Sequence, residues 1–208
     1  MIDGLLSFFP KLLVMQINFG GFVSASTVDW PGRAASVVFF RGCDLRCWYC
    51  HNKSILSGED LRDCDEVFEF ILQSQILTSG VIFTGGECTE QPDALIYLLN
   101  RCKENEIPAG IHTNGAHPEV IRYIAPLLTF VSLDIKTCLV PDAYHVVTGY
   151  SHVAEAAQAS LDLCANLYHS GKLPEFRIAH TEISDESLKW AEWYAREKHV
   201  PIVIQKRR

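Results

Sequence analysis

Residues 35–52 read "ASVVFFRGCDLRCWYCHN" and join two different patterns. The first six residues form a short apolar run, which is typical of a buried β-strand. The twelve that follow mix charged, polar and apolar residues and hold Cys43, Cys47 and Cys50 in a Cys-x3-Cys-x2-Cys arrangement. We therefore expect a strand whose carboxyl end opens directly into a cysteine-bearing loop.

Working outward from this stretch, five more runs of similar length and character follow along the chain. These strand candidates are residues 81–84, 109–114, 130–136, 175–180 and 201–205. Apolar residues repeat at helical spacing between several of them, at 67–72, 95–99 and 153–161. Asp63 and Ser184 precede two helical stretches as N-cap residues would. Six strands separated by helices predict an α/β fold with a parallel sheet and right-handed crossovers. Spacing alone leaves open whether this sheet curls into a partial barrel.

Composition limits the class of protein. The chain has 208 residues, of which 48% are apolar, so one globular domain is expected. A formal net charge of −7 argues against nucleic-acid binding, which depends on clustered Lys and Arg. We expect no signal peptide and no membrane span, because no apolar run reaches the roughly 18 residues that a span needs. Eight cysteines in a chain that is neither short nor loop-rich favour a reducing, cytoplasmic location.

Polar motifs lie at the carboxyl ends of four expected strands: the cysteine loop and "TGGE" (84–87) come after the first two, and "HTNG" (112–115) and "DIK" (134–136) end the next two. The carboxyl ends of parallel strands meet at one edge of a sheet, where ligands bind. The sequence therefore predicts one site built from all four motifs.

The three cysteines have a metal-binding spacing. Thiolates bind soft metals and iron–sulfur clusters, and three of them can hold a four-iron cluster while one iron stays open. Zinc is the alternative, although a structural zinc site normally has four ligands. Three of the remaining cysteines extend apolar helical stripes and are expected in the core: Cys64, Cys102 and Cys164. Cys88 and Cys138 fall in strand-end loops near the predicted site.

Three segments together carry a family resemblance: "STVDWPGRAASVVFFRGCDLRCWYCHN", "FTGGE" and "DIK". The cysteine spacing, with Tyr49 before the last cysteine, is similar to that of the radical S-adenosylmethionine (radical SAM) superfamily. Residues 20–205 resemble, more narrowly, the enzymes that activate glycyl radical enzymes. Among these the chain most resembles the activating proteins of anaerobic ribonucleoside-triphosphate reductase.

The resemblance implies a partial (β/α)6 barrel of the radical SAM type. It also implies two cofactors, a [4Fe-4S] cluster and S-adenosylmethionine, whose reductive cleavage gives a 5'-deoxyadenosyl radical. That radical would take a hydrogen atom from a glycine of a partner enzyme. Because the cofactor carries the radical, no residue is assigned a catalytic role.

Residue roles also follow from the resemblance. Cys43, Cys47 and Cys50 would ligate the cluster. The expected S-adenosylmethionine contacts are Tyr49, His51, Gly85, Gly86, Glu87, Thr113, Asp134, Lys136 and Arg177. Within that set, the "GGE" residues would meet the amino group, Lys136 would meet the carboxylate, and Tyr49 and His51 would flank the cluster. Two positions depart from the family pattern: His112 stands where an acidic residue is common, and Cys88 follows the "GGE" motif. A cation site built from Thr113 and Asp134 is therefore not expected.

The resemblance divides the chain into an N-terminal extension, residues 1–19, and a radical SAM domain, residues 20–208. The expected partner is a glycyl radical enzyme, with anaerobic ribonucleotide reductase favoured, and the expected electron donor is reduced flavodoxin or ferredoxin. Alternatives are an activase of pyruvate formate-lyase or another glycyl radical enzyme, and an enzyme acting on a small molecule. A non-enzymatic iron–sulfur or zinc binding module is a further alternative.

Overall fold

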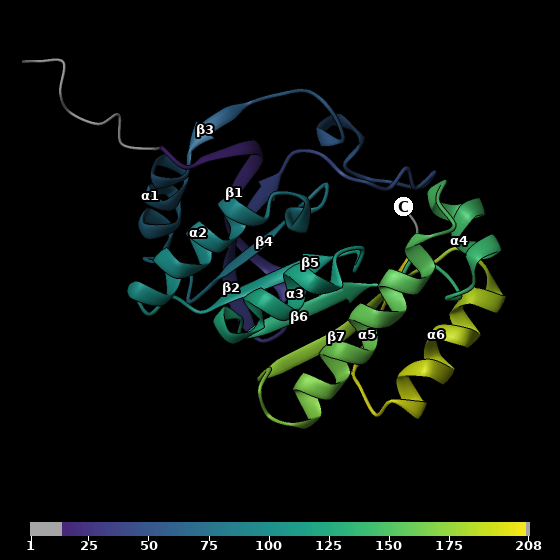
Figure 1. Ribbon diagram of the computed structural model, residues 1–208. Helices are drawn as coiled ribbons and strands as arrows, with labels where there is room; N and C mark the ends of the chain where they lie inside the picture. Colours follow the sequence, from purple (N-terminus) through teal and green to yellow (C-terminus); the bar gives the residue numbers. More distant parts are fainter. Residues whose placement is uncertain (1–13, 207–208) are drawn as a thin grey trace, which may run out of the picture.

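The computed structural model describes residues 14–206, in which strands and helices alternate along most of the chain (Figure 1). The strands are β1 (Gln16–Trp30), β2 (Arg33–Phe40), β3 (Leu61–Asp63), β4 (Val81–Gly85), β5 (Ala109–Thr113), β6 (Phe130–Asp134), β7 (Glu175–Glu182) and β8 (Ile202–Lys206). The helices are α1 (Cys64–Ser74), α2 (Pro92–Glu104), α3 (Pro118–Ile124), α4 (Pro141–Thr148), α5 (Val153–His169) and α6 (Asp185–Glu197). Short 3-10 turns are η1 (Lys53–Ile55), η2 (Cys88–Glu90) and η3 (Ala125–Leu127).

One sheet runs through the described residues in the order β3-β1-β2-β4-β5-β6-β7-β8. The strands from β2 to β8 along this order are all parallel, and each pair of neighbours is joined by at least one helix along the chain. This confirms the six predicted strands and their parallel arrangement. Strand β8 pairs with β7 alone in residues 14–206, so the sheet is not closed and the predicted partial barrel is confirmed.

Side chains alternate between the two faces of the parallel strands. One face of the sheet packs on the buried faces of α1, α2, α3 and α5 to form the main core. Its strand residues include Val38, Phe83, Ile111 and Val131. The opposite face holds a smaller buried cluster inside the curve of the sheet: Trp30, Ala35, Val37, Ile82 and Phe130. The helices therefore cover one face only, and the other is left as the interior of the partial barrel.

Strands β1 and β3 are antiparallel and were not predicted. Strand β1 lacks a clean alternation because its middle is half-exposed or exposed on both sides, and Val28 is 79% exposed. It begins at Gln16, so residues 16–19 of the predicted extension belong to the sheet, whereas residues 1–13 lie outside the described residues. The division into extension and domain stays a prediction.

The turn between β1 and β2 closes the base of the partial barrel. Gly32 follows Pro31 in this tight turn. Its φ of +72° is a left-handed backbone conformation that favours glycine. Just before it, the fully buried Trp30 ring stacks on Phe130 of β6 at 5.3 Å, and its Nε1 donates a hydrogen bond of 2.7 Å to Glu175 Oε2 of β7. The hairpin thereby reaches across the interior to strands on the far side of the sheet.

Local signals in the helices agree with the structure. Asp63 caps α1 by accepting from Asp65 N, and Ser184 caps α6 by accepting from Ser187 N. Cys64, Cys102 and Cys164 are fully buried in the main core, as predicted. Helices α3 and α4 were not predicted, because each is short and has too few turns to show a helical period.

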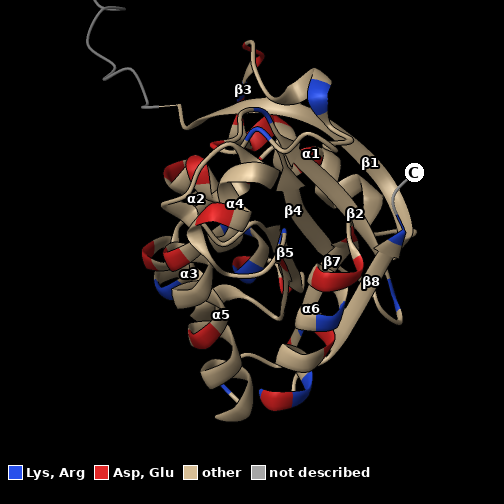
Figure 2. Cartoon of the chain, turned by 90° about the vertical axis from the view of Figure 1, so that its right-hand side faces the viewer, with Lys and Arg blue, Asp and Glu red and all other residues tan. Residues whose placement is uncertain are grey.

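The described helices include none that is both long and apolar enough to cross a bilayer. Acidic and basic residues are interspersed over the helices and loops rather than sorted by sign into separate faces (Figure 2).

Candidate active site

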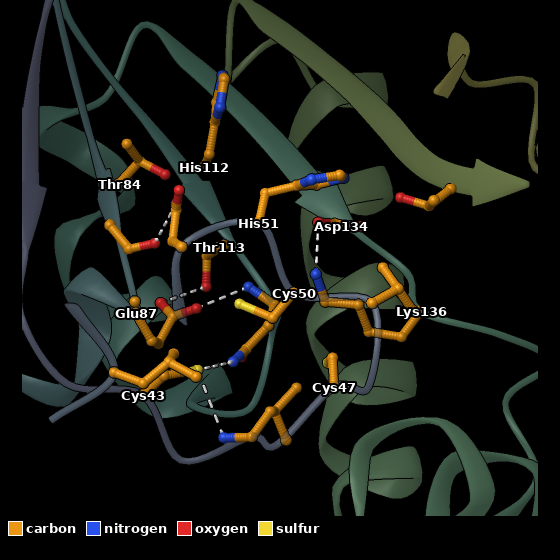
Figure 3. A pocket seen from close by; sticks show the side chains of 18 of the residues that line it. Cys43, Cys47, Cys50, His51, Thr84, Glu87, His112, Thr113, Asp134 and Lys136 are labelled. Carbon is orange, nitrogen blue, oxygen red and sulfur yellow. Dashed lines mark hydrogen bonds and ion pairs between the residues drawn. The ribbon is translucent and has the colours of Figure 1, made fainter. Parts of the chain in front are cut away.

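A cavity of about 210 Å³ opens at the carboxyl ends of the parallel strands, where the four polar motifs meet (Figure 3). The residues that line it are Cys43, Leu45, Cys47, Tyr49, Cys50, His51, Asn52, Leu56, Thr84, Gly85, Gly86, Glu87, His112, Thr113, Asn114, Asp134, Lys136, Thr181 and Gln205. Eleven of the twelve predicted site residues are therefore brought together, and Arg177 is the exception.

The cysteine loop leaves β2 and runs past the mouth of this cavity without regular structure. Its three thiols are free and half-buried. Burial raises the pKa of Cys43 to about 12 and also raises that of Cys47, so these thiols are protonated until a metal displaces the proton. Among residues 14–206, no three His, Cys, Asp or Glu side chains are arranged to hold a single metal ion.

Close backbone approach explains why two glycines open the "GGE" motif. A Cβ on Gly86 would lie 1.7 Å from Gly42 O, and one on Gly85, whose φ is +130°, would lie 2.2 Å from Phe40 O. Instead Gly86 N donates to Phe40 O and Glu87 N to Gly42 O, both at 2.8 Å. The glycines thus let β4 dock against the start of the cysteine loop, a reason in the protein itself rather than in a ligand.

Glu87 is a buried carboxylate, only 1% exposed. Its Oε1 accepts from Thr89 N, Thr89 Oγ1 and Thr113 Oγ1, and its Oε2 accepts from Asn114 N at 2.7 Å. Burial raises the pKa of Glu87, and these hydrogen bonds act in the opposite direction. Since the donors are neutral, a cation beside this carboxylate would offset the effect of burial and favour its charged form.

Asp134 and Lys136 lie on the opposite wall of the cavity from Glu87 (Figure 3). Lys136 Nζ is 2.5 Å from Asp134 Oδ2. Burial works to lower the pKa of Lys136, but Asp134, Tyr49 and Cys47 outweigh it and the pKa is raised well above its ordinary value. Asp134 lines the cavity, and its Oδ1 is buried without a hydrogen-bond partner among the described residues.

Three further predicted residues line the same cavity. Thr113 Oγ1 donates a hydrogen bond of 2.8 Å to Glu87 Oε1, so Thr113 helps to hold that carboxylate in place. The Tyr49 ring lies 6.0 Å from Lys136 Nζ, and its hydroxyl is buried without a partner. His51 is exposed at the rim.

His112, which lines the cavity, and Arg177, which does not, both contact the backbone oxygen of Asp29 in β1. His112 Nε2 lies 2.9 Å from Asp29 O, and Arg177 NH2 donates to the same oxygen at 3.3 Å. Arg177 also donates to Ser132 Oγ at 3.0 Å. Arg177 lies outside the cavity lining, with Nε bonded to β6 and NH2 bonded to β1, and its contact with S-adenosylmethionine stays a prediction.

Sequence reasoning missed Asn114, which is 5% exposed and sits between the cysteine loop and Glu87. Its backbone N donates to Glu87, and its side chain donates to Asp44 Oδ1 at 2.9 Å and to Cys43 Sγ at 3.9 Å. The motif "HTNG" contained the signal, since a polar residue directly after a buried strand marks the ligand edge of the sheet.

Residues 37–172, from β2 through α5 and beyond, match the radical SAM superfamily. The chain belongs to the radical SAM superfamily. Its cofactors are those of this family, a [4Fe-4S] cluster and S-adenosylmethionine.

Two relatives that are named as activating enzymes match part of the chain. A protein of Methanocaldococcus jannaschii, named as a glycyl-radical enzyme activating enzyme, is 37% identical over 125 residues, or 59% of this chain and 51% of that protein. The pyruvate formate-lyase-activating enzyme of Clostridium pasteurianum is 38% identical over 133 residues, covering 61% of this chain and 55% of the enzyme. The chain thus spans about half the length of these relatives.

Solved structures share the fold of the described chain. The structure of TYW1 with a lysine-pyruvate adduct bound has a TM-score of 0.61 at 19% identity and covers 83% of this chain and 64% of its own. At this identity the likeness speaks for the fold.

The donor set fits the two cofactors of the family. Three thiols are the soft ligands that iron–sulfur clusters use, and three rather than four leave one iron for another ligand. Beside them, the buried Glu87 and the unused Asp134 Oδ1 present negative charge, and Lys136 presents positive charge. An amino acid with its ammonium and carboxylate groups matches such a lining.

Proposed function

We propose that this chain is an activating enzyme that generates a glycyl radical on a partner enzyme. The observation that carries the proposal is the single cavity in which the Cys-x3-Cys-x2-Cys loop, the buried Glu87 and the Asp134–Lys136 pair meet. The relatives named for glycyl radical activation support the reaction class.

Cys43, Cys47 and Cys50 would hold the [4Fe-4S] cluster. When bound, the cluster and S-adenosylmethionine together supply one-electron cleavage to a 5'-deoxyadenosyl radical, which removes a hydrogen atom from the target. The loop would supply the three ligands, and its own Leu45, between Cys43 and Cys47, is buried in the core. Apolar burial on that side limits water at the site and tunes the cluster.

S-adenosylmethionine would lie between the two walls of the cavity. Glu87 and the "GGE" backbone would orient its amino group, and Lys136 would orient its carboxylate. Tyr49, His51 and Asp134 would complete the surroundings, while Thr113 would hold Glu87 in place. For Arg177 a supporting place beneath the cavity fits its described hydrogen bonds better than direct contact.

The substrate proposed is a glycine-bearing loop of a large partner, with anaerobic ribonucleotide reductase favoured. An open sheet edge at β8, whose Gln205 lines the cavity, supports entry of a protein loop from the side. Pyruvate formate-lyase is the second candidate partner, favoured by the 38% identity to its activating enzyme. A cytoplasmic location and reduced flavodoxin or ferredoxin as donor belong to the same proposal.

The first test is anaerobic reconstitution with iron and sulfide, followed by electron paramagnetic resonance of the reduced protein with and without S-adenosylmethionine. A four-iron signal that changes on addition is expected. Cys43→Ser should lose the cluster, and the matched control Cys138→Ser, a half-buried thiol outside the loop, should keep it. A cluster whose signal ignores S-adenosylmethionine contradicts the proposal, as does zinc bound without iron.

The second test separates the partners. The reconstituted protein, S-adenosylmethionine and a reductant are mixed with each purified candidate, and the organic radical on the candidate is measured by electron paramagnetic resonance. A radical on anaerobic ribonucleotide reductase alone is expected. A radical on pyruvate formate-lyase alone would keep the reaction class and replace the partner.

A further inference from the structure

Asn114 connects three of the four strand-end motifs through one residue. Directly after β5, its backbone N–H donates to Glu87 Oε2 at 2.7 Å. Its side-chain Nδ2 donates to Asp44 Oδ1 at 2.9 Å and to Cys43 Sγ at 3.9 Å. The side chain thus contacts the cysteine loop while the backbone of the same residue contacts the "GGE" motif.

The orientation of the Asn114 amide is fixed by its own hydrogen bonds. Its Oδ1 accepts from Ala116 N at 2.8 Å, so the oxygen must face the following turn. The other end must then be the amino group, which agrees with the Asp44 carboxylate beside it, since a carboxylate needs a donor. A flipped amide would lose both bonds, and the N–H groups therefore point at Cys43 and Asp44.

We infer that Asn114 is a positioning residue that tunes the cluster by donating a hydrogen bond to the Cys43 sulfur; the inference rests on the proposed ligation by Cys43. A second donor, Leu45 N, lies 3.4 Å from the same sulfur. Hydrogen bonds to a ligand sulfur stabilise negative charge there, and they stabilise the reduced cluster more because it carries one more electron. Asn114 thus raises the reduction potential of the cluster.

Asn114 also sets the distance between the two halves of the site. Its backbone holds Glu87, which is proposed to meet the amino group of S-adenosylmethionine, and its side chain holds the loop that carries Cys43. Substitution of the side chain removes only the second connection. The two effects can therefore be separated by experiment.

The test is the midpoint potential of the cluster, measured anaerobically by spectroelectrochemistry in the absence of S-adenosylmethionine and of any partner. Asn114→Ala should bind iron and sulfide as the unsubstituted protein does. At a fixed potential its ratio of reduced to oxidised cluster should fall on the order of tenfold, or about 59 mV toward negative potential for one electron.

Asn52→Ala is the matched control. Asn52 lines the same cavity, but its Nδ2 donates to Gly85 O at 3.1 Å rather than to sulfur, so the potential should stay unchanged. Asn114→Ser is a second variant, since its hydroxyl can still accept from Ala116 N and thus preserve the turn; it should show the same negative shift.

An unchanged potential in a fully loaded Asn114→Ala or Asn114→Ser protein overturns the role of Asn114. Loss of the cluster from both variants would also overturn it, because Asn114 would then be needed for assembly rather than tuning. A Cys43→Ser protein that keeps its full cluster would overturn the proposed ligation instead, so the two failures are distinguishable.

Discussion

Glu87 lies almost completely out of water and meets neutral donors on every described side. A carboxylate in such a place has a high desolvation cost that hydrogen bonds offset only in part. A bound cation would offset the rest, which is why this residue supports the proposed amino-group contact more strongly than any other side chain in the cavity. Thr89 and Thr113 hold its Oε1 and Asn114 N holds its Oε2, which leaves the carboxylate little freedom of rotation.

Gly86 should not tolerate a side chain. Gly86→Ala would place a methyl group within the van der Waals radius of Gly42 O, a backbone atom that cannot move without the cysteine loop. We expect a loss of stability on the order of 3 kcal/mol or more, measured by urea denaturation.

Gly171→Ala is the control for Gly86→Ala. Gly171 has a φ of +70° and open space around its Cβ position, so alanine there adds backbone strain of about 1 kcal/mol without a clash. Equal losses in the two variants would show that close approach is not what requires glycine at position 86.

Among the elements, β1 contributes more than an edge to the sheet. Its end carries Trp30 and Asp29 across the interior, where they meet side chains of β5, β6 and β7. Parallel strands alone leave the base of an open barrel unfilled, and the hairpin fills it with an aromatic ring. The cavity above is therefore closed at the bottom by a strand whose sequence gave little sign of this role.

Trp30→Phe tests this closure. Phenylalanine keeps the stacking on Phe130 but loses the hydrogen bond to Glu175, a charged acceptor, so unfolding free energy should fall by about 1.5–3 kcal/mol. Trp193→Phe, at a residue 53% exposed on α6, should change it by no more than about 0.5 kcal/mol in the same urea titration. A Trp30→Phe protein as stable as the control would mean that the bond to Glu175 contributes nothing.

His180 joins three elements and makes their packing sensitive to pH. Its Nδ1 lies 2.7 Å from Ile135 O beyond β6, and its Nε2 lies 3.3 Å from Ser187 Oγ of α6. Burial lowers the pKa of His180 below its ordinary value of 6.5, against a smaller opposing effect of the Ile135 carbonyl. The folded protein therefore keeps this imidazole neutral at a pH where the unfolded chain already binds a proton.

Stability from His180 is thus fully present above pH 6.5 and is lost as pH falls from there toward the folded pKa. We expect the melting temperature to decline across this window in the unsubstituted protein and to decline less in His180→Asn. The exposed His152→Asn variant should follow the unsubstituted protein. Parallel curves for all three proteins would contradict the assignment.

For the whole molecule, ligand binding and folding are linked. If S-adenosylmethionine binds between the two walls of the cavity, it adds up to about 2.7 kcal/mol at a hundredfold excess over its dissociation constant. The reconstituted protein should therefore melt at a higher temperature with S-adenosylmethionine than without it, and Glu87→Gln should reduce this increase. The metal-free protein is the control, and an equal increase there would show that the cluster takes no part in binding.

The sequence was most informative for features whose pattern lies within a single strand, helix or loop. Six parallel strands, the cysteine loop and three core cysteines all carry local patterns, and the structure agrees with them. Strand β1 carries no such pattern, because its alternation is interrupted by register shifts against β2. Asn114 and Arg177 depend on partners 71 and 148 residues away, and no local spacing reports such contacts.

The eight cysteines fall into two groups with different exposure. Cys64, Cys88, Cys102 and Cys164 are buried, whereas the three of the loop and Cys138 are half-exposed. If the loop thiols hold the proposed cluster, oxygen would reach it at half-exposed sulfurs, whereas the four buried thiols are shielded by the core. Oxidative damage is therefore expected first at the cysteine loop and last at the core cysteines.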